Sequence, residues 1–298
     1  MKLFGYSYQD YVGKLLTIVS PLLSDRVYIS LFYFFTFHRR IDLKNPQTYN
    51  EKLQWLKLND KHSEYTQLVD KYKSREVVSK IVGDEYLIPL LGVWDSFEEI
   101  DFSTLPNQFV LKTNHDSQGV IVCKDKESFD IKAARKKLTK CLKHNYYRNS
   151  REYPYKDVKR KIIAERFMED HHFGELRDYK FFCFNGRCEF FFIATGRSHG
   201  ESAIRFDWFD RDLNTIPVVQ GHPNSVVLPA IPQNIDEMIK IAERLSQNYP
   251  QIRIDLYNIE GKIYTGEFTI FHFGGLKPFA PKEYDTKFGQ FIHLPSIN

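Results

Sequence analysis

The sequence predicts an α+β protein in which antiparallel hairpins are combined with amphipathic helices. Two patterns indicate this class: apolar and polar residues alternate on both sides of short polar turns, and apolar stripes of helical period follow capping residues. The third observation is size, because 298 residues with 42% hydrophobic content can bury one large core or two smaller lobes.

The helices are predicted from caps and periodicity. Thr48 and Glu51 form a capping box at the start of the first helix of the main body, and Asp130 caps a basic helix that runs to about Asn145. The lysines of that helix are more typical of a solvated face than of a binding site. Further helices are expected over 65–81, which Gly83 ends, and over 235–247.

The strands are predicted from alternation and turn residues. Asn185-Gly186 is a strong two-residue hairpin turn. The expected strands are a short buried one at 89–93, a hairpin over 109–113 and 119–123, single strands at 162–168 and 204–210, a hairpin over 178–184 and 188–195, and a last hairpin over 253–269. The polar, aromatic segment 146–161 reads as an ordered loop or lid.

Composition limits the class of partner and the compartment. A formal net charge of +4 is too small an excess to indicate nucleic acid as the main partner, and it suits anionic small substrates. The four cysteines show no zinc spacing, which favours a reduced, cytoplasmic protein. Lys14, Ser20, Pro21 and Asp25 interrupt the first apolar stretch, so we expect no signal peptide.

The N-terminal residues leave two interpretations open. The aromatic run Val27 to Phe37 is well short of the roughly 20 residues that cross a bilayer. Residues 11–40 nevertheless combine Tyr, Phe and Leu with basic residues, a composition typical of an interfacial segment. A peripheral contact of residues 1–40 with the inner face of the membrane or with glycan-assembly machinery is one interpretation. A helix pair packed on the main domain is the other.

The last hairpin contains the most informative side chains. Arg253 and Asp255 are two residues apart and share a face, while Glu267 comes from the returning strand. Asp255 and Glu267 pair directly only with an odd loop centred on Gly261 or with a bulge, since a strict two-residue turn would place them on opposite faces. Paired carboxylates typically hold Mg²⁺ against nucleotide phosphates, but a solvated hairpin edge fits the same pattern.

Two lysines lie within apolar strands. Lys112 and Lys180 would each be costly to bury without a partner. Phosphate would be such a partner, and an exposed strand face is the alternative. The backbone N–H groups of 114–119 could cover phosphates, although one glycine makes this a weak signal. Glu165, at the end of a strand, could contact a base or ribose.

Five collinear motifs make the chain resemble a known family. They are residues 50–58, 69–73, 109–112 with 115–117, 178–186, and 253–257 with 266–269. Over about 45–290 the chain resembles the teichuronopeptide-biosynthesis (TupA-like) branch of the ATP-grasp superfamily. The resemblance implies two α+β lobes that sandwich ATP, with an N-terminal helical extension. The implied regions are the extension at 1–45, a helical pre-ATP-grasp region at 46–106, a small lobe at 107–168 and a large lobe at 169–298.

The resemblance also implies roles for individual residues. Arg253 and Lys180 would be catalytic, and Asp255, Glu267 and Thr269 would hold Mg²⁺. Thr269 stands where many ATP-grasp enzymes have Asn, and a hydroxyl is a weaker ligand than an amide oxygen. The implied ATP-binding residues are Lys112, His115, Asp116, Ser117, Gly119, Glu165, Arg166, Phe167, Met168 and Lys180.

The implied activity is that of an ATP-dependent carboxylate–amine ligase that works through an acyl phosphate. We expect amide formation on a uronic acid or similar sugar acid in bacterial capsule or cell-surface polysaccharide biosynthesis, with a small-molecule or glycan carboxylate and an amine as co-substrates. A glycosyltransferase of the same pathway and an ATP-dependent glycan kinase are the alternatives. Arg148, Arg151 and Lys156 are expected to face the anionic glycan from the 146–161 segment.

Overall fold

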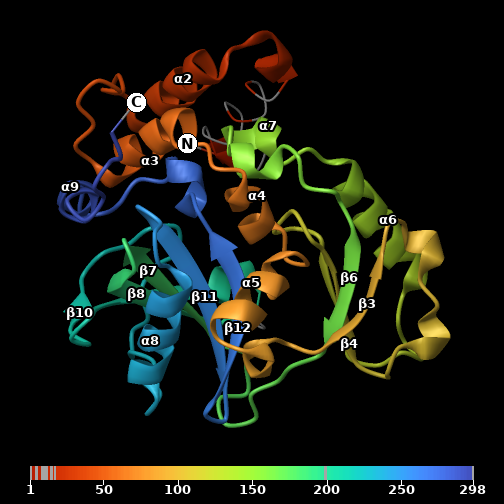
Figure 1. The fold of residues 1–298 in the computed structure, drawn as a ribbon. Helices are drawn as coiled ribbons and strands as arrows, with labels where there is room; N and C mark the ends of the chain where they lie inside the picture. The colour runs from red at the N-terminus through yellow and green to blue at the C-terminus, as the bar shows by residue number, and fades with distance from the viewer. Residues whose placement is uncertain are drawn as a thin grey trace.

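Two large antiparallel sheets and the helices around them form most of the molecule (Figure 1), and β1 (Lys2–Leu3) pairs with β2 (Tyr6–Ser7) in a separate two-stranded sheet. The computed structural model describes residues 2–3, 6–7, 13, 16, 18–197 and 200–296, of which residues 2, 3, 6 and 7 are described by their backbone. Much of the segment 1–17, on which part of the N-terminal prediction falls, therefore lies outside the described residues.

The larger sheet has six strands in the order β10-β9-β8-β7-β11-β12. Its strands are β7 (Asp178–Phe184), β8 (Arg187–Thr195), β9 (Arg205–Asp210), β10 (Thr215–Ile216), β11 (Ile252–Ile259) and β12 (Lys262–Thr269). The β7–β8 turn is the expected Asn185-Gly186, with φ of 48° and 82°. Every residue of β7 is buried, and aromatic rings stack across the sheet, as with Phe182 and Phe190 at 4.7 Å.

The smaller sheet has four strands in the order β3-β6-β4-β5. They are β3 (Leu90–Trp94), β4 (Phe109–Thr113), β5 (Val120–Cys123) and β6 (Ile162–Arg166). The expected hairpin of β4 and β5 is present. Strand β3 lies at the sheet edge and is half-buried, whereas the sequence predicts a buried strand there. It joins this sheet from residues 46–106, the region that the resemblance places before the small lobe.

Helices cover the sheets and fill the space between them (Figure 1). They are α2 (Asp25–Phe37), α3 (Tyr49–Asn59), α4 (Glu64–Val69), α5 (Ser74–Ile81), α6 (Ile131–Lys143), α7 (Tyr147–Ser150), α8 (Ile235–Leu245) and α9 (Glu283–Gly289). Both predicted caps are present, the capping box of Thr48 with Glu51 on α3 and the Asp130 cap on α6. Helix α8 packs on the large sheet, and α6 packs on β4.

The helix predicted over 65–81 is two helices, because Asp70 interrupts it. The Asp70 carboxylate accepts the backbone N–H groups of Tyr72 and Lys73, at 2.9 and 3.2 Å, and also the side-chain amide of Asn114 at 2.8 Å. A side chain that captures these donors offers the backbone an alternative to the helical ladder. The break between α4 and α5 consequently lies against the small-lobe loop 114–119.

Helix α2 packs on the main body, as one of the two N-terminal interpretations predicts. Tyr28 and Tyr33 are fully buried, and the Tyr28 hydroxyl donates to the backbone oxygen of Asn149 at 2.7 Å. In the described part of the chain, no helix is both long and apolar enough to span a bilayer. The four cysteines are free thiols.

Candidate active site

The hairpin of β11 and β12 contains a two-residue turn and a bulge. Glu260 and Gly261 form the turn with φ of 52° and 86°, and Ile259 faces Lys262. This turn alone would set Asp255 and Glu267 on opposite faces. The register shifts after Asp255, however, so that Asp255 faces Glu267 while Leu256 faces Thr265. Gly266 is the extra residue, and the bulge fulfils the geometric condition set by the sequence.

The bulge leaves little space for a side chain at position 266. A Cβ atom there would lie 3.0 Å from Cε2 of Tyr257 and 3.2 Å from the backbone oxygen of Asp255. Both neighbours belong to the facing strand, and one of them is backbone that cannot move without disturbing the ladder. A side chain at Gly266 would therefore push β12 away from β11 beside Asp255.

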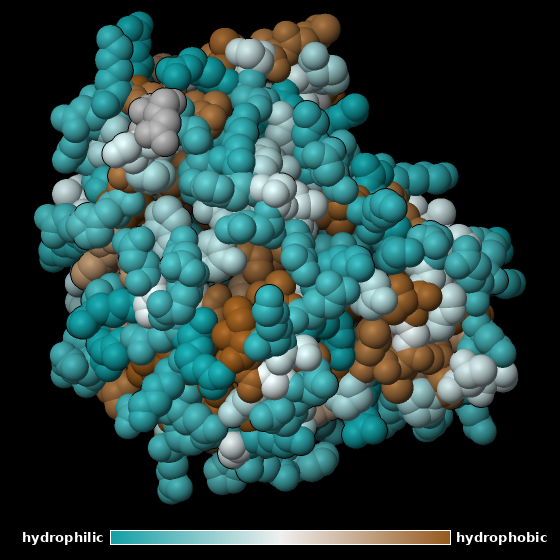
Figure 2. Space-filling model, in the orientation of Figure 1, coloured by the Kyte–Doolittle hydropathy of each residue, from teal (hydrophilic) through white to brown (hydrophobic). Residues whose placement is uncertain are grey.

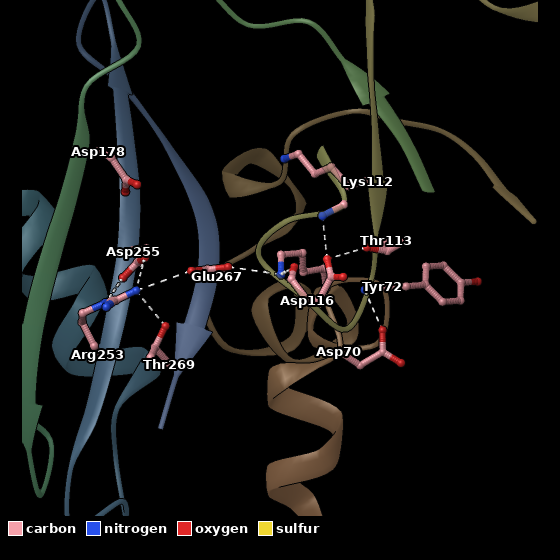
Figure 3. Close-up of polar contacts among 12 residues, drawn as sticks. Asp70, Tyr72, Lys112, Thr113, Asp116, Asp178, Arg253, Asp255, Glu267 and Thr269 are labelled. Atoms are coloured by element: carbon pink, nitrogen blue, oxygen red, sulfur yellow. Dashed lines mark hydrogen bonds and ion pairs between the residues drawn. The ribbon is translucent and has the colours of Figure 1, made fainter. Parts of the chain in front are cut away.

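Three oxygens of the hairpin converge on one nitrogen of Arg253 (Figure 3). Nη2 of Arg253 lies 2.7 Å from Oδ2 of Asp255, 2.8 Å from Oγ1 of Thr269 and 3.4 Å from Oε1 of Glu267. Nε also donates to Oδ1 of Asp255 at 2.6 Å. Burial opposes the charge of the guanidinium, but Asp255 and then Glu267 hold the pKa of Arg253 above its usual range.

Lys180 completes this group from the neighbouring strand. Residue 180 of β7 faces residue 255 of β11, and its ammonium bonds to Oδ2 of Asp255 and lies 2.7 Å from Oδ2 of Asp178. Arg197 lies 2.7 Å from the same Asp178 oxygen. Lys180 is buried, and the carboxylates of Asp178 and Asp255 neutralise its charge. The sequence predicted either a phosphate partner or an exposed strand face for this lysine.

His272 accepts a hydrogen bond from the Arg253 guanidinium. It lies in the turn η8 (His272–Gly275) and is buried, with Nδ1 2.5 Å from Nη1 of Arg253 and Nε2 3.0 Å from Oε1 of Gln220. Arg253 can only donate and the Gln220 oxygen can only accept, so the neutral tautomer with a proton on Nε2 satisfies both. Burial, followed by the charges of Arg253 and Lys180, lowers the pKa of His272 well below its usual value.

On the small lobe, Lys112 and Glu165 bond to each other. Nζ of Lys112 lies 2.6 Å from Oε2 of Glu165, and Nη1 of Arg75 lies 3.7 Å from the other carboxylate oxygen. The sequence assigned Lys112 to phosphate and Glu165 to the base or ribose. In this structure the two form an ion pair across β4 and β6, which satisfies the lysine inside its apolar strand.

Asp116 closes the loop between β4 and β5. Its Oδ1 accepts the hydroxyl of Thr113 at 2.6 Å and the backbone N–H of Gly119 at 2.7 Å. Although burial opposes ionisation, these hydrogen bonds lower the pKa of Asp116. A Cβ at Gly119 would lie 1.9 Å from Oγ1 of Thr113, so this position requires glycine. Ser117 is exposed at the loop tip.

His115 and the residues after β6 lie apart from the ion-pair network. His115 is buried, with Nε2 3.2 Å from the backbone oxygen of His144, and burial lowers its pKa. The Arg166 side chain is exposed at the end of β6, and its backbone N–H donates to the backbone oxygen of Pro89 at 2.9 Å. Phe167 and Met168 follow in the connection from β6 to β7, and Phe167 packs under the ammonium of Lys124. Their assignment to ATP stays a prediction.

Lys71 is a residue of the site that was not predicted from the sequence. It lies in the break between α4 and α5, with Nζ 3.3 Å from Oε2 of Glu267 and 2.8 Å from the backbone oxygen of Asp116. Burial raises the pKa of Glu267, but Lys71, Lys180 and Arg253 together lower it far below its ordinary value. The only signal was the 69–73 motif of the family resemblance.

Arg151 does not face a substrate, contrary to the expectation for the 146–161 segment. Its guanidinium is buried, donates to the backbone oxygens of Ser20 and Leu23, and lies over the ring of Tyr28 at 4.6 Å. Backbone oxygens and an aromatic ring therefore provide the partners of this cation within the protein, in place of the anionic glycan that was expected. Arg151 attaches the N-terminal helices to the main body.

The donor set of the hairpin suits Mg²⁺. The ion prefers oxygen ligands, keeps several waters, and is usually bound by one or two carboxylates together with substrate phosphates. Oxygens of Asp255, Glu267 and Thr269 converge on one nitrogen of the Arg253 guanidinium. This cluster of oxygens favours a positive charge at its centre. Within the described residues, no cluster of three or more His, Cys, Asp or Glu could hold a metal without a substrate.

Comparisons with known proteins identify a family. The model of the TupA-like ATP-grasp family matches residues 51–293. Among solved structures, D-alanine–D-alanine ligase from Helicobacter pylori is 14% identical, with a TM-score of 0.43, over 84% of this chain and 67% of its own. An L-amino acid ligase from Bacillus licheniformis is 11% identical, with a TM-score of 0.45, over 76% and 50%.

These structures are longer than the chain, which spans between half and two thirds of their length. Similarity this low carries neither activity nor substrate from one protein to another. No curated protein matches the chain.

Proposed function

The chain belongs to the TupA-like ATP-grasp family, and from this membership and the site geometry we propose an ATP-dependent carboxylate–amine ligase. One observation carries the proposal: oxygens of Asp255, Glu267 and Thr269 converge on Arg253 (Figure 3). Lys71 and the loop between β4 and β5 lie on the other side of Glu267. Phosphoryl transfer needs positioned cations and metal-binding oxygens more than a side-chain nucleophile.

The proposed reaction has two steps, formation of an acyl phosphate and formation of the amide. A carboxylate oxygen of the substrate attacks the γ-phosphorus of ATP, and the bond to the ADP oxygen breaks to give an acyl phosphate and ADP. An amine then attacks the acyl carbon, the bond to phosphate breaks, and the products are an amide, inorganic phosphate and a proton.

The residues of this chain position and neutralise the phosphates. Lys112 and Lys180 now pair with Glu165 and Asp255, so nucleotide binding exchanges an internal carboxylate for a phosphate at each lysine. Each ammonium thereby keeps an anionic partner, and the Asp255 carboxylate becomes available to a cation. Arg253 stabilises the phosphoryl group during transfer.

Asp255 and Glu267, with the Thr269 hydroxyl, would hold Mg²⁺, which would neutralise phosphate charge and orient the γ-phosphate.

We propose a uronic acid or similar sugar acid as the carboxylate, in bacterial capsule or cell-surface polysaccharide biosynthesis on the cytoplasmic side of the membrane. The support is the TupA-like branch, which is associated with polymers of uronic acids and amino acids. The basic excess of the chain, at +4, suits an anionic acceptor.

A screen of ADP release over uronic acids crossed with amino acids and amino alcohols tests the proposal. ADP and phosphate that appear only with both a carboxylate and an amine support the ligase, and Glu267→Gln is the inactive control. ADP release that needs no amine would indicate a kinase. Release of UDP or CMP from a sugar nucleotide would indicate a glycosyltransferase.

A further inference from the structure

We propose that the N-terminal helical segment docks on an anionic membrane surface through an exposed apolar face. Val27, Leu31 and Phe34 are exposed and share this face of α2 at helical spacing. Ile18 and Leu22, which precede the helix, are 75% and 86% exposed. In Figure 2 brown atoms lie on the outer surface at the top, where Figure 1 places this segment. Exposed apolar patches of this kind mark interaction sites.

Helix α2 is apolar on both of its sides. Its inner side, with Tyr28, Ile29 and Tyr33, packs on the main body. Val27 and Leu31 are four residues apart on the outer side, where a helix of a soluble domain normally has polar residues. The inner side already provides the packing that fixes the helix, so the outer side is available for a partner.

Charge favours an anionic bilayer as that partner. Arg26 is exposed in the first turn of α2, and Arg40 and Lys44 are exposed after its end. Of the neighbouring charges, Arg39 pairs with Glu51 and Asp25 with Arg151, so these exposed cations outnumber the one exposed carboxylate, that of Asp42. Basic residues that flank an apolar helical face are typical of helices that lie in the interface of an anionic membrane. In a twofold dimer formed through this face, both copies would bring the same basic ends to the contact. Anionic headgroups complement them.

The length of the helix fits an interfacial position. Thirteen residues extend over roughly 20 Å, which is too short to span the hydrocarbon core. The helix would lie in the membrane plane with Leu31 and Phe34 among the acyl chains. Tyr28 and Arg151 would hold the main body beneath it.

Co-sedimentation of the full chain with vesicles tests the proposal. One set of vesicles contains phosphatidylcholine alone and the other equal parts of phosphatidylcholine and phosphatidylglycerol. We expect binding to the anionic set that raised salt weakens. Combined Val27→Gln, Leu31→Gln and Phe34→Gln should weaken it roughly tenfold or more, because the apolar area that enters the acyl region is lost.

The chain provides a matched control. Val226, Val227 and Leu228 form another exposed apolar run, with exposed fractions higher than those of Val27, Leu31 and Phe34. Their combined replacement by Gln should leave vesicle binding unchanged. Arg26→Gln with Arg40→Gln should weaken binding to the anionic vesicles alone.

Three outcomes would overturn the proposal: no binding of the native chain to anionic vesicles, unchanged binding of the α2 variant, or a native dimer that the α2 variant converts to a monomer. Circular dichroism establishes that the variants are folded. Hydrogen exchange of the α2 amides, slowed by vesicles, gives a readout that needs no variant.

Discussion

The ammonium of Lys71 lies between the two lobes, 3.3 Å from the Glu267 carboxylate and 2.8 Å from the backbone oxygen of Asp116. One side chain from the α4–α5 break thus touches both the β11–β12 hairpin and the loop between β4 and β5. Its position depends on Asp70, which interrupts the helix and binds Asn114 at the base of that loop.

Replacing Lys71 tests its contribution to the site. Lys71→Met removes a charge-assisted contact of about 1.5–3 kcal/mol, so we expect kcat/KM for ATP to fall roughly tenfold to a hundredfold. Lys71→Arg should retain part of the activity. Steady-state kinetics at saturating carboxylate and amine measures the change. Unaltered kcat/KM in a folded Lys71→Met protein would contradict this role.

The two acidic residues should respond differently to neutral substitution. Asp255 is buried between Lys180 and Arg253, so Asp255→Asn removes the carboxylate that the two cations share and leaves them only Asp178 and Glu267. It should destabilise the fold by about 3 kcal/mol. Glu267→Gln should abolish Mg²⁺-dependent turnover. Its cost in stability should be smaller than that of Asp255→Asn, because the Glu267 side chain is 32% exposed. Urea unfolding and a Mg²⁺ titration of activity separate the two effects. Full activity in the Glu267 variant would refute the metal assignment.

The bulge can be tested at Gly266. Gly266→Ala introduces a Cβ against Tyr257 and the Asp255 backbone, and overpacking of this kind costs about 1–3 kcal/mol. We expect a lower melting temperature and a weaker response to Mg²⁺, because the strands separate beside the acid pair. Adding Tyr257→Leu removes the ring contact and should restore part of the stability. A Gly266→Ala protein with native melting and native Mg²⁺ response would show that the bulge tolerates a side chain.

Acid should destabilise the fold through His272. Its pKa is lowered in the folded chain, whereas the unfolded chain titrates near 6.5. As pH falls below about 6.5 the unfolded state takes up a proton that the folded state does not, so stability is lost in this direction and is fully present above it. His272→Gln can keep both hydrogen bonds and does not titrate. Its urea-unfolding free energy should fall less than that of the native chain between neutral pH and the mildly acidic range. Equal pH dependence would contradict the assignment.

The hairpins could be predicted because their determinants are local. Alternation and turn residues define β7–β8 and β11–β12, and the acid pair of Asp255 and Glu267 follows once a bulge is allowed. The position of that bulge is not local information, since it depends on the register in which β12 pairs with β11.

Side chains that meet distant partners could not be predicted in this way. Lys112 and Glu165 are far apart in sequence, and their ion pair depends on the order β3-β6-β4-β5. Arg151 lies in a polar segment typical of a binding loop, yet it is buried by contacts with Ser20 and Tyr28. The pattern of a single segment contains no information about such contacts.

Trp208 gives the protein an internal optical probe. Its indole is fully buried, and its ring centre lies 6.4 Å from that of His272, which contacts Arg253. A change in the charge around Arg253 is therefore transmitted to a fluorophore through one intervening side chain. With Trp55 and Trp94 replaced by Phe, the emission of Trp208 should report occupancy of the proposed phosphate region in a stopped-flow instrument without any added label.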